Sequence, residues 1–123
     1  MISFKERERF RKFDPTIGQR DEAEHVIYDC SLDKNYTLED FLDEIKRRTN
    51  DTEWIEMPNI DIIMNGRKVP LCDYDPAREE WEFYNNYEWY EEIKNSIIQS
   101  VNPVETVNVW MYIEINLVEV LDG

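Results

Sequence analysis

Few side chains in the chain have the type and spacing that acid–base or nucleophilic chemistry requires. The one histidine, His25, opens an apolar run, and no neighbouring pattern marks a group that would orient it as a general base. The two cysteines, Cys30 and Cys72, form no Cys-x-x-Cys motif, so neither a zinc site nor a dithiol redox site is indicated. Both lie in strand-like runs, where cysteine usually acts as a small buried residue. We expect His25 to be a structural or surface residue.

The acidic residues are too numerous to identify a catalytic pair. The chain has 28 Asp and Glu, so some pair at a plausible spacing occurs by chance. They do not form the glycine-centred loop that binds calcium, and the three glycines provide no phosphate-binding loop. We therefore expect no enzyme activity, no cofactor and no metal.

The stretch from Asp75 to Glu92 is the most unusual part of the chain, because glutamates and aromatic rings are interleaved there. Six rings exceed what one helical face buries, which is about three or four residues per two turns. Two interpretations stay open: the rings seal the core beneath an irregular connection, or some are exposed and mark an interaction site. The partner-binding residues predicted on the second interpretation are Glu79, Glu80, Trp81, Glu82, Tyr84, Tyr87, Glu88, Trp89, Glu91 and Glu92.

The net charge of −14 is unevenly distributed along the chain. Residues 1–20 hold six Lys or Arg and three Asp or Glu, whereas the rest hold eight basic and 25 acidic residues. The acidic body repels nucleic acid and anionic membranes and attracts basic protein surfaces. The alternative is that the charge serves solubility alone. For the basic start we expect pairing with the acidic body, or a solvated helix, in preference to phosphate binding.

Elements that position these residues can be predicted from hydrophobic periodicity. Residues 1–13 favour an amphipathic helix that ends at Asp14-Pro15, and residues 25–30 predict a strand. Thr37 begins the clearest helix, because it can form a capping box with Asp40. Its apolar positions share one helical face, and its acidic and basic residues lie at the ends that the helix dipole favours. These apolar positions are Leu38, Phe41, Leu42 and Ile45.

A hairpin is predicted in the middle of the chain. Residues 54–57 and 60–64 are strand-like, and Pro58-Asn59 between them indicates a bulge or an edge. Asn65-Gly66 favours a two-residue turn, and residues 68–74 form the returning strand. Pro70 within that strand indicates an edge position.

The last third of the chain predicts two helices and one long strand. Asp75-Pro76 is typical of a helix start, with Ala77, Trp81 and Tyr84 on one face. A second helix is predicted over residues 87–101, and Pro103 ends it. Apolar residues then alternate from Val107 to Leu117, which indicates a central strand with one buried face. Trp110 and Tyr112 lie on its opposite face, where either a helix covers them or they form an exposed pair.

Together these elements predict a single domain over residues 1–123, with a basic N-terminal element (1–20) and an acidic body (25–123). The expected fold class is α+β, with a mostly antiparallel sheet of about four strands and two or three helices packed on it. No apolar run approaches the ~20 residues that span a membrane, and the charged start is unlike a signal peptide. We expect a cytoplasmic protein with reduced thiols.

The run Tyr36–Ile45, the following Trp54-Ile55, the hairpin and the last strand resemble small uncharacterised proteins of phages and mobile elements. The resemblance covers residues 26–74 and the last strand, and it carries over no functional residue. It implies a mobile-element context, in which acidic inhibitors of host nucleases are a known class.

The sequence therefore predicts a non-enzymatic acidic protein that binds or inhibits a partner with a basic, nucleic-acid-binding surface. The most specific version of this prediction is a nucleic-acid mimic of the anti-CRISPR or anti-restriction type, which does not itself bind nucleic acid. The alternative is a structural or regulatory interaction module, including a homodimer, whose charge serves solubility only.

Overall fold

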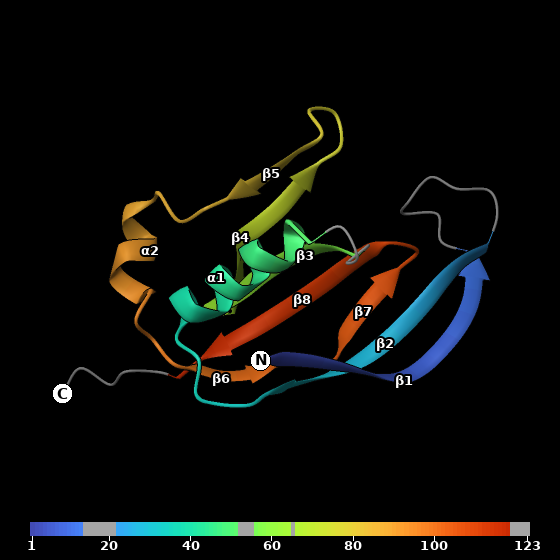
Figure 1. Ribbon diagram of the computed structural model, residues 1–123, viewed down its shortest axis with the longest axis horizontal. Coiled ribbons are helices and arrows are strands. Elements are labelled where there is room, and N and C mark those ends of the chain that lie inside the picture. The colour runs from blue at the N-terminus through green and yellow to red at the C-terminus, as the bar shows by residue number, and fades with distance from the viewer. Residues whose placement is uncertain (14–21, 52–55, 65, 119–123) are drawn as a thin grey trace.

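The computed structural model describes residues 1–13, 22–51, 56–64 and 66–118. These residues form one mixed, mostly antiparallel sheet of eight strands with two helices (Figure 1). The elements are β1 (Ile2–Phe13), β2 (Glu22–Leu32), α1 (Leu38–Thr49), β3 (Met57–Met64), β4 (Arg67–Asp75), β5 (Glu80–Phe83), α2 (Glu88–Ile93), β6 (Ile98–Val101), β7 (Val104–Val107) and β8 (Trp110–Leu117). The expected α+β class is confirmed, but the sheet has twice the expected number of strands.

The strand order is β1-β2-β7-β8-β3-β4-β5, with β6 also paired to β8. β8 is central, because β7 and β6 pair with it in antiparallel fashion and β3 pairs with it in parallel. Met111, Ile113 and Ile115 of β8 are buried, which confirms the predicted central strand with one buried face. That strand begins only at Trp110. Of the residues predicted as its start, Val107 ends β7, and residues 108 and 109 form the turn between β7 and β8, where Asn108 has φ of +56°.

Helix α1 crosses one face of the sheet (Figure 1) and begins as predicted. The Thr37 hydroxyl accepts the Asp40 N–H at 3.1 Å, and the Asp40 carboxylate accepts the Thr37 N–H at 3.4 Å. Lys46, Arg47 and Arg48 form the basic last turn. Because both ends are satisfied in this way, the short helix can place its apolar face on the sheet.

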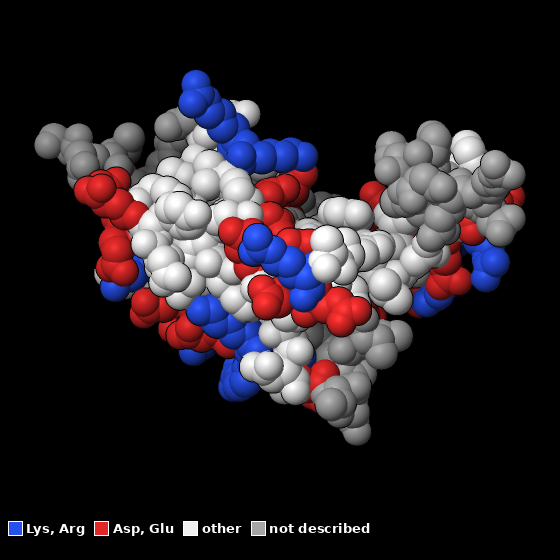
Figure 2. All heavy atoms as spheres, turned by 90° about the horizontal axis from the view of Figure 1, so that it is seen from above, with Lys and Arg blue, Asp and Glu red and all other residues white. Residues whose placement is uncertain are grey.

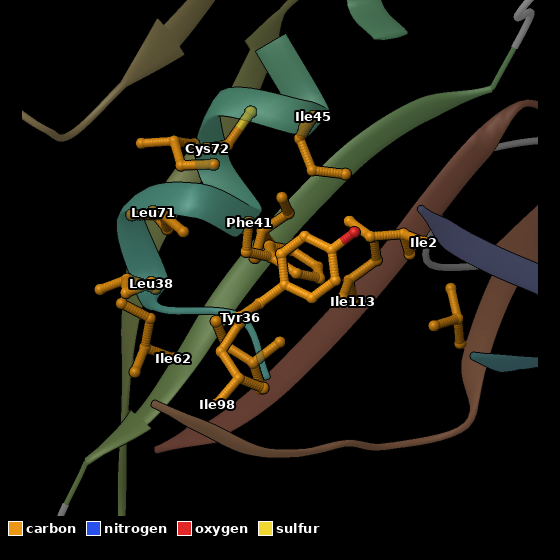
Figure 3. Packing of buried hydrophobic residues seen from close by; sticks show 14 of the residues in the cluster. Ile2, Tyr36, Leu38, Phe41, Ile45, Ile62, Leu71, Cys72, Ile98 and Ile113 are labelled. Atoms are coloured by element: carbon orange, nitrogen blue, oxygen red, sulfur yellow. The ribbon is translucent and has the colours of Figure 1, made fainter. Parts of the chain in front are cut away.

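The core lies between α1 and the strands beneath it. Figure 3 shows Leu38, Phe41 and Ile45 of α1 in one cluster with Ile62 and Ile113 of the sheet. Tyr36, just before the helix, also lies in this cluster and is 3% exposed. Burial of large apolar side chains here provides the main favourable free energy of folding.

The N-terminal prediction of a helix or a solvated helix is wrong, because residues 2–13 form β1. This strand pairs along its length with β2, with one irregularity between Glu6 and Glu8. Phe4 packs edge-on against Tyr28, and Phe10 stacks on His25 with ring centroids 5.1 Å apart. These cross-strand ring contacts decide the conformation where local periodicity was weak. The expected end at Asp14-Pro15 lies outside the described residues.

The two helices predicted after Asp75 are also largely wrong. The Asp75 carboxylate accepts the Ala77 N–H at 3.0 Å, which forms a turn and not a helix cap. Residues 80–83 alternate Glu with Trp or Phe, and this period of two forms strand β5. The predicted second helix is reduced to α2, and the β-branched residues after it form β6.

The predicted hairpin is confirmed, since Met64 pairs with Arg67 across the turn and Gly66 has φ of +76°. Pro70 lies where β4 has β3 on one side only, because β5 pairs with residues 72–75, so its predicted edge position is also confirmed. Pro58 does not interrupt β3, but it lies where β3 pairs with β8 alone, so the predicted edge alternative is confirmed. The irregularity falls instead between Ile60 and Asp61. The strand predicted over residues 54 and 55 lies outside the described residues.

None of the helices in the described part of the chain is both long and apolar enough to cross a membrane.

Candidate protein-binding surface

The acidic–aromatic segment, residues 75–92, lies at one edge of the sheet (Figure 1). It contains a turn, the outermost strand β5, a short connection and α2. The ten predicted partner-binding residues therefore lie on neighbouring elements, but these are a turn, a strand and a short helix in place of the two predicted helices. On β5 the glutamates and the rings lie on opposite faces of the sheet, because side chains of successive strand residues point to opposite faces.

The rings of β5 belong to the face that α1 covers. The ring centroid of Trp81 lies 5.0 Å from that of Tyr74 on β4 and 6.4 Å from that of Phe83. The Lys46 ammonium of α1 lies 4.9 Å from the centroid of Phe83. Trp81 and Phe83 are half-buried in this row, so they contribute to the core. For these two rings the core interpretation holds.

A second row of rings follows β5. The ring centroids of Tyr84 and Tyr87 are 5.8 Å apart, those of Tyr87 and Trp89 are 6.3 Å apart, and Trp89 contacts Tyr90 edge-on. Tyr90 is only 4% exposed and anchors α2, whereas Tyr87 is 50% exposed. Tyr87, supported by Trp89, is therefore the ring of the segment that a partner can reach.

Two tyrosines of this row, Tyr84 and Tyr90, keep their hydroxyl groups protonated near neutral pH. Burial, aided by Glu39 and Asp43, raises the pKa of Tyr90 to about 12. Burial also raises the pKa of Tyr84, whose hydroxyl donates to Asp73 Oδ2 at 3.1 Å. Both hydroxyls therefore remain hydrogen-bond donors near neutral pH.

All six glutamates of the segment are exposed. They are Glu79, Glu80, Glu82, Glu88, Glu91 and Glu92. Within the described residues only Glu91 of the six forms an ion pair, with Lys94 at 2.9 Å. Most of these carboxylates therefore keep their charge available for a partner.

A group of six acidic residues lies on the sheet face opposite α1, and the sequence prediction included only two of them, Glu80 and Glu82. The β4–β5 register places Asp73 directly opposite Glu82 and Asp75 directly opposite Glu80. On the neighbouring strands Asp61 of β3 lies beside Glu114 of β8. Burial, together with the charges of Asp73 and Glu114, raises the pKa of Asp61. We call this group the acidic stripe, and it comprises Asp61, Asp73, Asp75, Glu80, Glu82 and Glu114. Alternation of acidic residues at 73 and 75 and at 80 and 82 was the signal that could have revealed it.

The negative charge does not cover the molecule uniformly. Figure 2, which views the molecule from the β4–β5 side, shows several acidic groups with Lys and Arg between them. One of these groups lies at the end of the molecule where α2 is found in Figure 1.

The basic N-terminal strand is paired with the acidic body, as one of the two sequence interpretations expected. Arg7 contacts Asp29, and Arg9 contacts Glu24 and lies 2.8 Å from Glu6. Arg11 lies 3.4 Å from Glu24. These arginines are therefore already used to hold β1 on β2.

The histidine and the two cysteines are partly or fully buried. His25 is 1% exposed, and its Nδ1 lies 2.7 Å from Glu105 Oε1. Burial raises the pKa of Cys30 to about 11 and that of Cys72 to about 12, so both thiols resist ionisation. Among the residues described, no three His, Cys, Asp or Glu are arranged to hold a metal ion.

Two surface hollows, of about 630 and 790 Å³, are lined by neither His25 nor the acidic–aromatic segment. Comparisons with protein-family models, with curated proteins and with solved structures find no match for this chain.

Proposed function

We propose that the protein is a non-enzymatic binding protein that engages a basic surface of another protein through the acidic–aromatic segment. The exposure of all six glutamates of the segment, together with the half-exposed Tyr87, is the observation that carries this proposal. Carboxylates speed and orient encounter with a basic surface, and a rigid ring provides a desolvated anchor.

The partner surface is best sought among nucleic-acid-binding grooves, because they are the large basic surfaces of intracellular proteins. An inhibitor that occupies such a groove acts as a nucleic-acid mimic, as anti-CRISPR and anti-restriction proteins do. Direct nucleic-acid binding is not part of the proposal, since Arg7, Arg9 and Arg11 pair with the protein's own carboxylates.

A structural module that self-associates is the second candidate. Tyr112 is 44% exposed on the sheet face opposite α1, and neither described helix covers that face (Figure 1). In that case two copies would meet through this face and the charge would serve solubility.

The test is affinity capture from lysate with stepwise salt elution, repeated with Tyr87→Ala and with Tyr112→Ala as the matched control. The proposal expects a nucleic-acid enzyme that elutes at moderate salt, is displaced by added DNA, and is lost with Tyr87→Ala only. Recovery that does not change with salt, or light scattering that shows a dimer abolished by Tyr112→Ala, would favour the second candidate.

A further inference from the structure

We propose that the free edge of β5 receives an extended segment of the partner as an added strand, with Lys or Arg at alternate positions facing the acidic stripe. This inference rests on the proposed function and specifies how the basic partner is held. β-strand addition uses main-chain hydrogen bonds for affinity and alternate side chains for specificity.

The hydrogen-bond pattern shows which backbone groups are available. β5 pairs with β4 alone among the described strands. The Tyr84 N–H donates to the Leu71 carbonyl at 3.0 Å. In an antiparallel ladder, hydrogen-bonded residue pairs alternate with pairs that are not hydrogen-bonded. Glu82 and Glu80 lie two and four residues before Tyr84, so they also direct their backbone N–H and C=O groups toward β4. The N–H and C=O groups of Trp81 and Phe83 therefore point to the open side.

The cross-strand pairs between β4 and β5 include two pairs of carboxylates, which basic side chains of a partner would stabilise. Asp73 opposes Glu82 and Asp75 opposes Glu80, and like charges directly opposite each other are unfavourable. A strand beside β5 would place side chains next to Glu80 and Glu82 on the same face. Its alternate residues repeat about every 7 Å, as those two glutamates do. Lys or Arg at these positions would offset the repulsion.

Cations of the protein itself neutralise the acidic stripe only in part. Lys68 lies 2.9 Å from Glu114, and Arg78 lies 3.9 Å from Asp75. No ion pair within the described residues involves Asp73, Glu80 or Glu82. The raised pKa of Asp61, due to burial and to Asp73 and Glu114, agrees with a stripe that has an excess of negative charge.

The opposite edge of the sheet is protected in a way that β5 is not. β1 carries Lys and Arg along the strand and an irregularity between Glu6 and Glu8, and both features discourage strand addition. β5 has neither Lys, Arg nor Pro, and its pairing with β4 is regular. The β1 of a second copy is a poor occupant, because its irregularity breaks the alternation and its arginines are paired. The occupant is therefore a segment of a different protein.

The test uses the full chain and a short synthetic peptide in which Lys alternates with Thr. Amide NMR should show that the Trp81 and Phe83 N–H groups shift and become protected from exchange when the peptide binds. The control peptide has the same sequence with alternate backbone nitrogens methylated, so it keeps the charge but cannot complete the ladder. It should bind at least tenfold more weakly.

Two double variants distinguish strand addition at β5 from attraction by the net negative charge of the protein. E80Q/E82Q should weaken binding of the Lys-Thr peptide by roughly three- to tenfold, the factor for two exposed charge pairs. E8Q/E22Q removes the same charge from exposed positions at the opposite edge of the sheet, outside the acidic–aromatic segment, and should leave binding within about twofold. Equal binding of the methylated peptide, or equal loss in both variants, would overturn strand addition and leave the proposed function standing.

Two further outcomes test which molecule binds the free edge of β5. If neither peptide binds at low salt, the result counts against both the inference and the proposed function. Protection of the Trp81 amide that grows with protein concentration in the absence of peptide would overturn the inference in favour of a second copy of this chain.

Discussion

A single buried carboxylate, that of Glu44 in α1, joins the start of β1 to the helix. Its Oε1 accepts the Ile2 N–H at 3.0 Å and lies 3.5 Å from the Arg48 guanidinium. Burial alone would raise the pKa of Glu44, but the hydrogen bonds from Ile2 and Tyr36 and the charge of Arg48 lower it below its ordinary value. The folded state therefore binds this proton less readily than the unfolded chain does.

We predict that Glu44→Gln lowers the free energy of unfolding by about 1–3 kcal/mol at neutral pH, because it removes a charge-assisted acceptor from a buried site. A group with a lowered folded pKa stabilises above its unfolded pKa, and the stabilisation is lost as the pH falls through the folded pKa. The difference between the two proteins should therefore shrink below about pH 4. Urea unfolding at several pH values measures it. A difference that is constant with pH would contradict the assigned role.

The cross-strand pair of Asp73 and Glu82 allows a graded prediction at the same scale. Glu82→Gln removes the repulsion, and Glu82→Lys replaces it with attraction, so stability should increase in the order Glu, Gln, Lys. The whole range should be about 0.2–1 kcal/mol, as for other cross-strand pairs. Thermal unfolding of the three proteins tests the order, and equal stabilities would show that the two carboxylates do not interact.

Among the elements, α1 shows most clearly how local signals determine structure. Its first amides have partners of two kinds: the Thr37 hydroxyl accepts from Asp40, while Leu38 and Glu39 donate to the carbonyls of Ser96 and Lys94 after α2. Thr37→Ala should therefore cost about 1 kcal/mol, the value of one capping bond, and not unfold the helix. Thr37→Ser is the control, because it keeps the hydroxyl. A loss in Thr37→Ser as large as that in Thr37→Ala would mean that the methyl group and not the cap matters.

The success of the sequence predictions follows the range of the interactions that form each element. α1 and the turn at Gly66 were predictable because a capping box and a two-residue turn depend on adjacent residues. β1 was not, because its conformation depends on pairing with β2 and on the stacking of Phe10 on His25. Contacts distant in sequence override weak local periodicity.

The candidate surface was predictable in composition but not in geometry. The sequence indicated a segment of glutamates and rings, some of which could be exposed, and the structure leaves its six glutamates and Tyr87 exposed. It did not indicate that Trp81 would lie against Tyr74 on the sheet face that α1 covers, or that Glu82 would lie opposite Asp73. Those positions depend on the register of β4 and β5, which a turn at Glu79 with φ of +54° determines. Strand register sets which face each side chain occupies, and it is fixed by the turn and by the partner strand.

For the molecule as a whole, the imbalance of charge predicts opposite salt effects on folding and on binding. Added salt weakens ion pairs such as Arg7–Asp29, but it also screens repulsion among the carboxylates. The chain has 28 acidic and 14 basic residues, so half of its carboxylates exceed the number of available cations and repulsion dominates. The melting temperature should therefore rise between low salt and about 0.5 M NaCl, where charges more than about 5 Å apart are screened.

Capture of a basic partner should weaken over the same range of salt, because the attraction between opposite charges is screened. Differential scanning fluorimetry and binding titrations in the same buffers measure the two effects together. A melting temperature that falls with salt would show that intramolecular ion pairs dominate and that the carboxylates are already neutralised within the fold. The excess of negative charge would then be too small to attract a basic partner, and the self-associating module would be the better account of the protein.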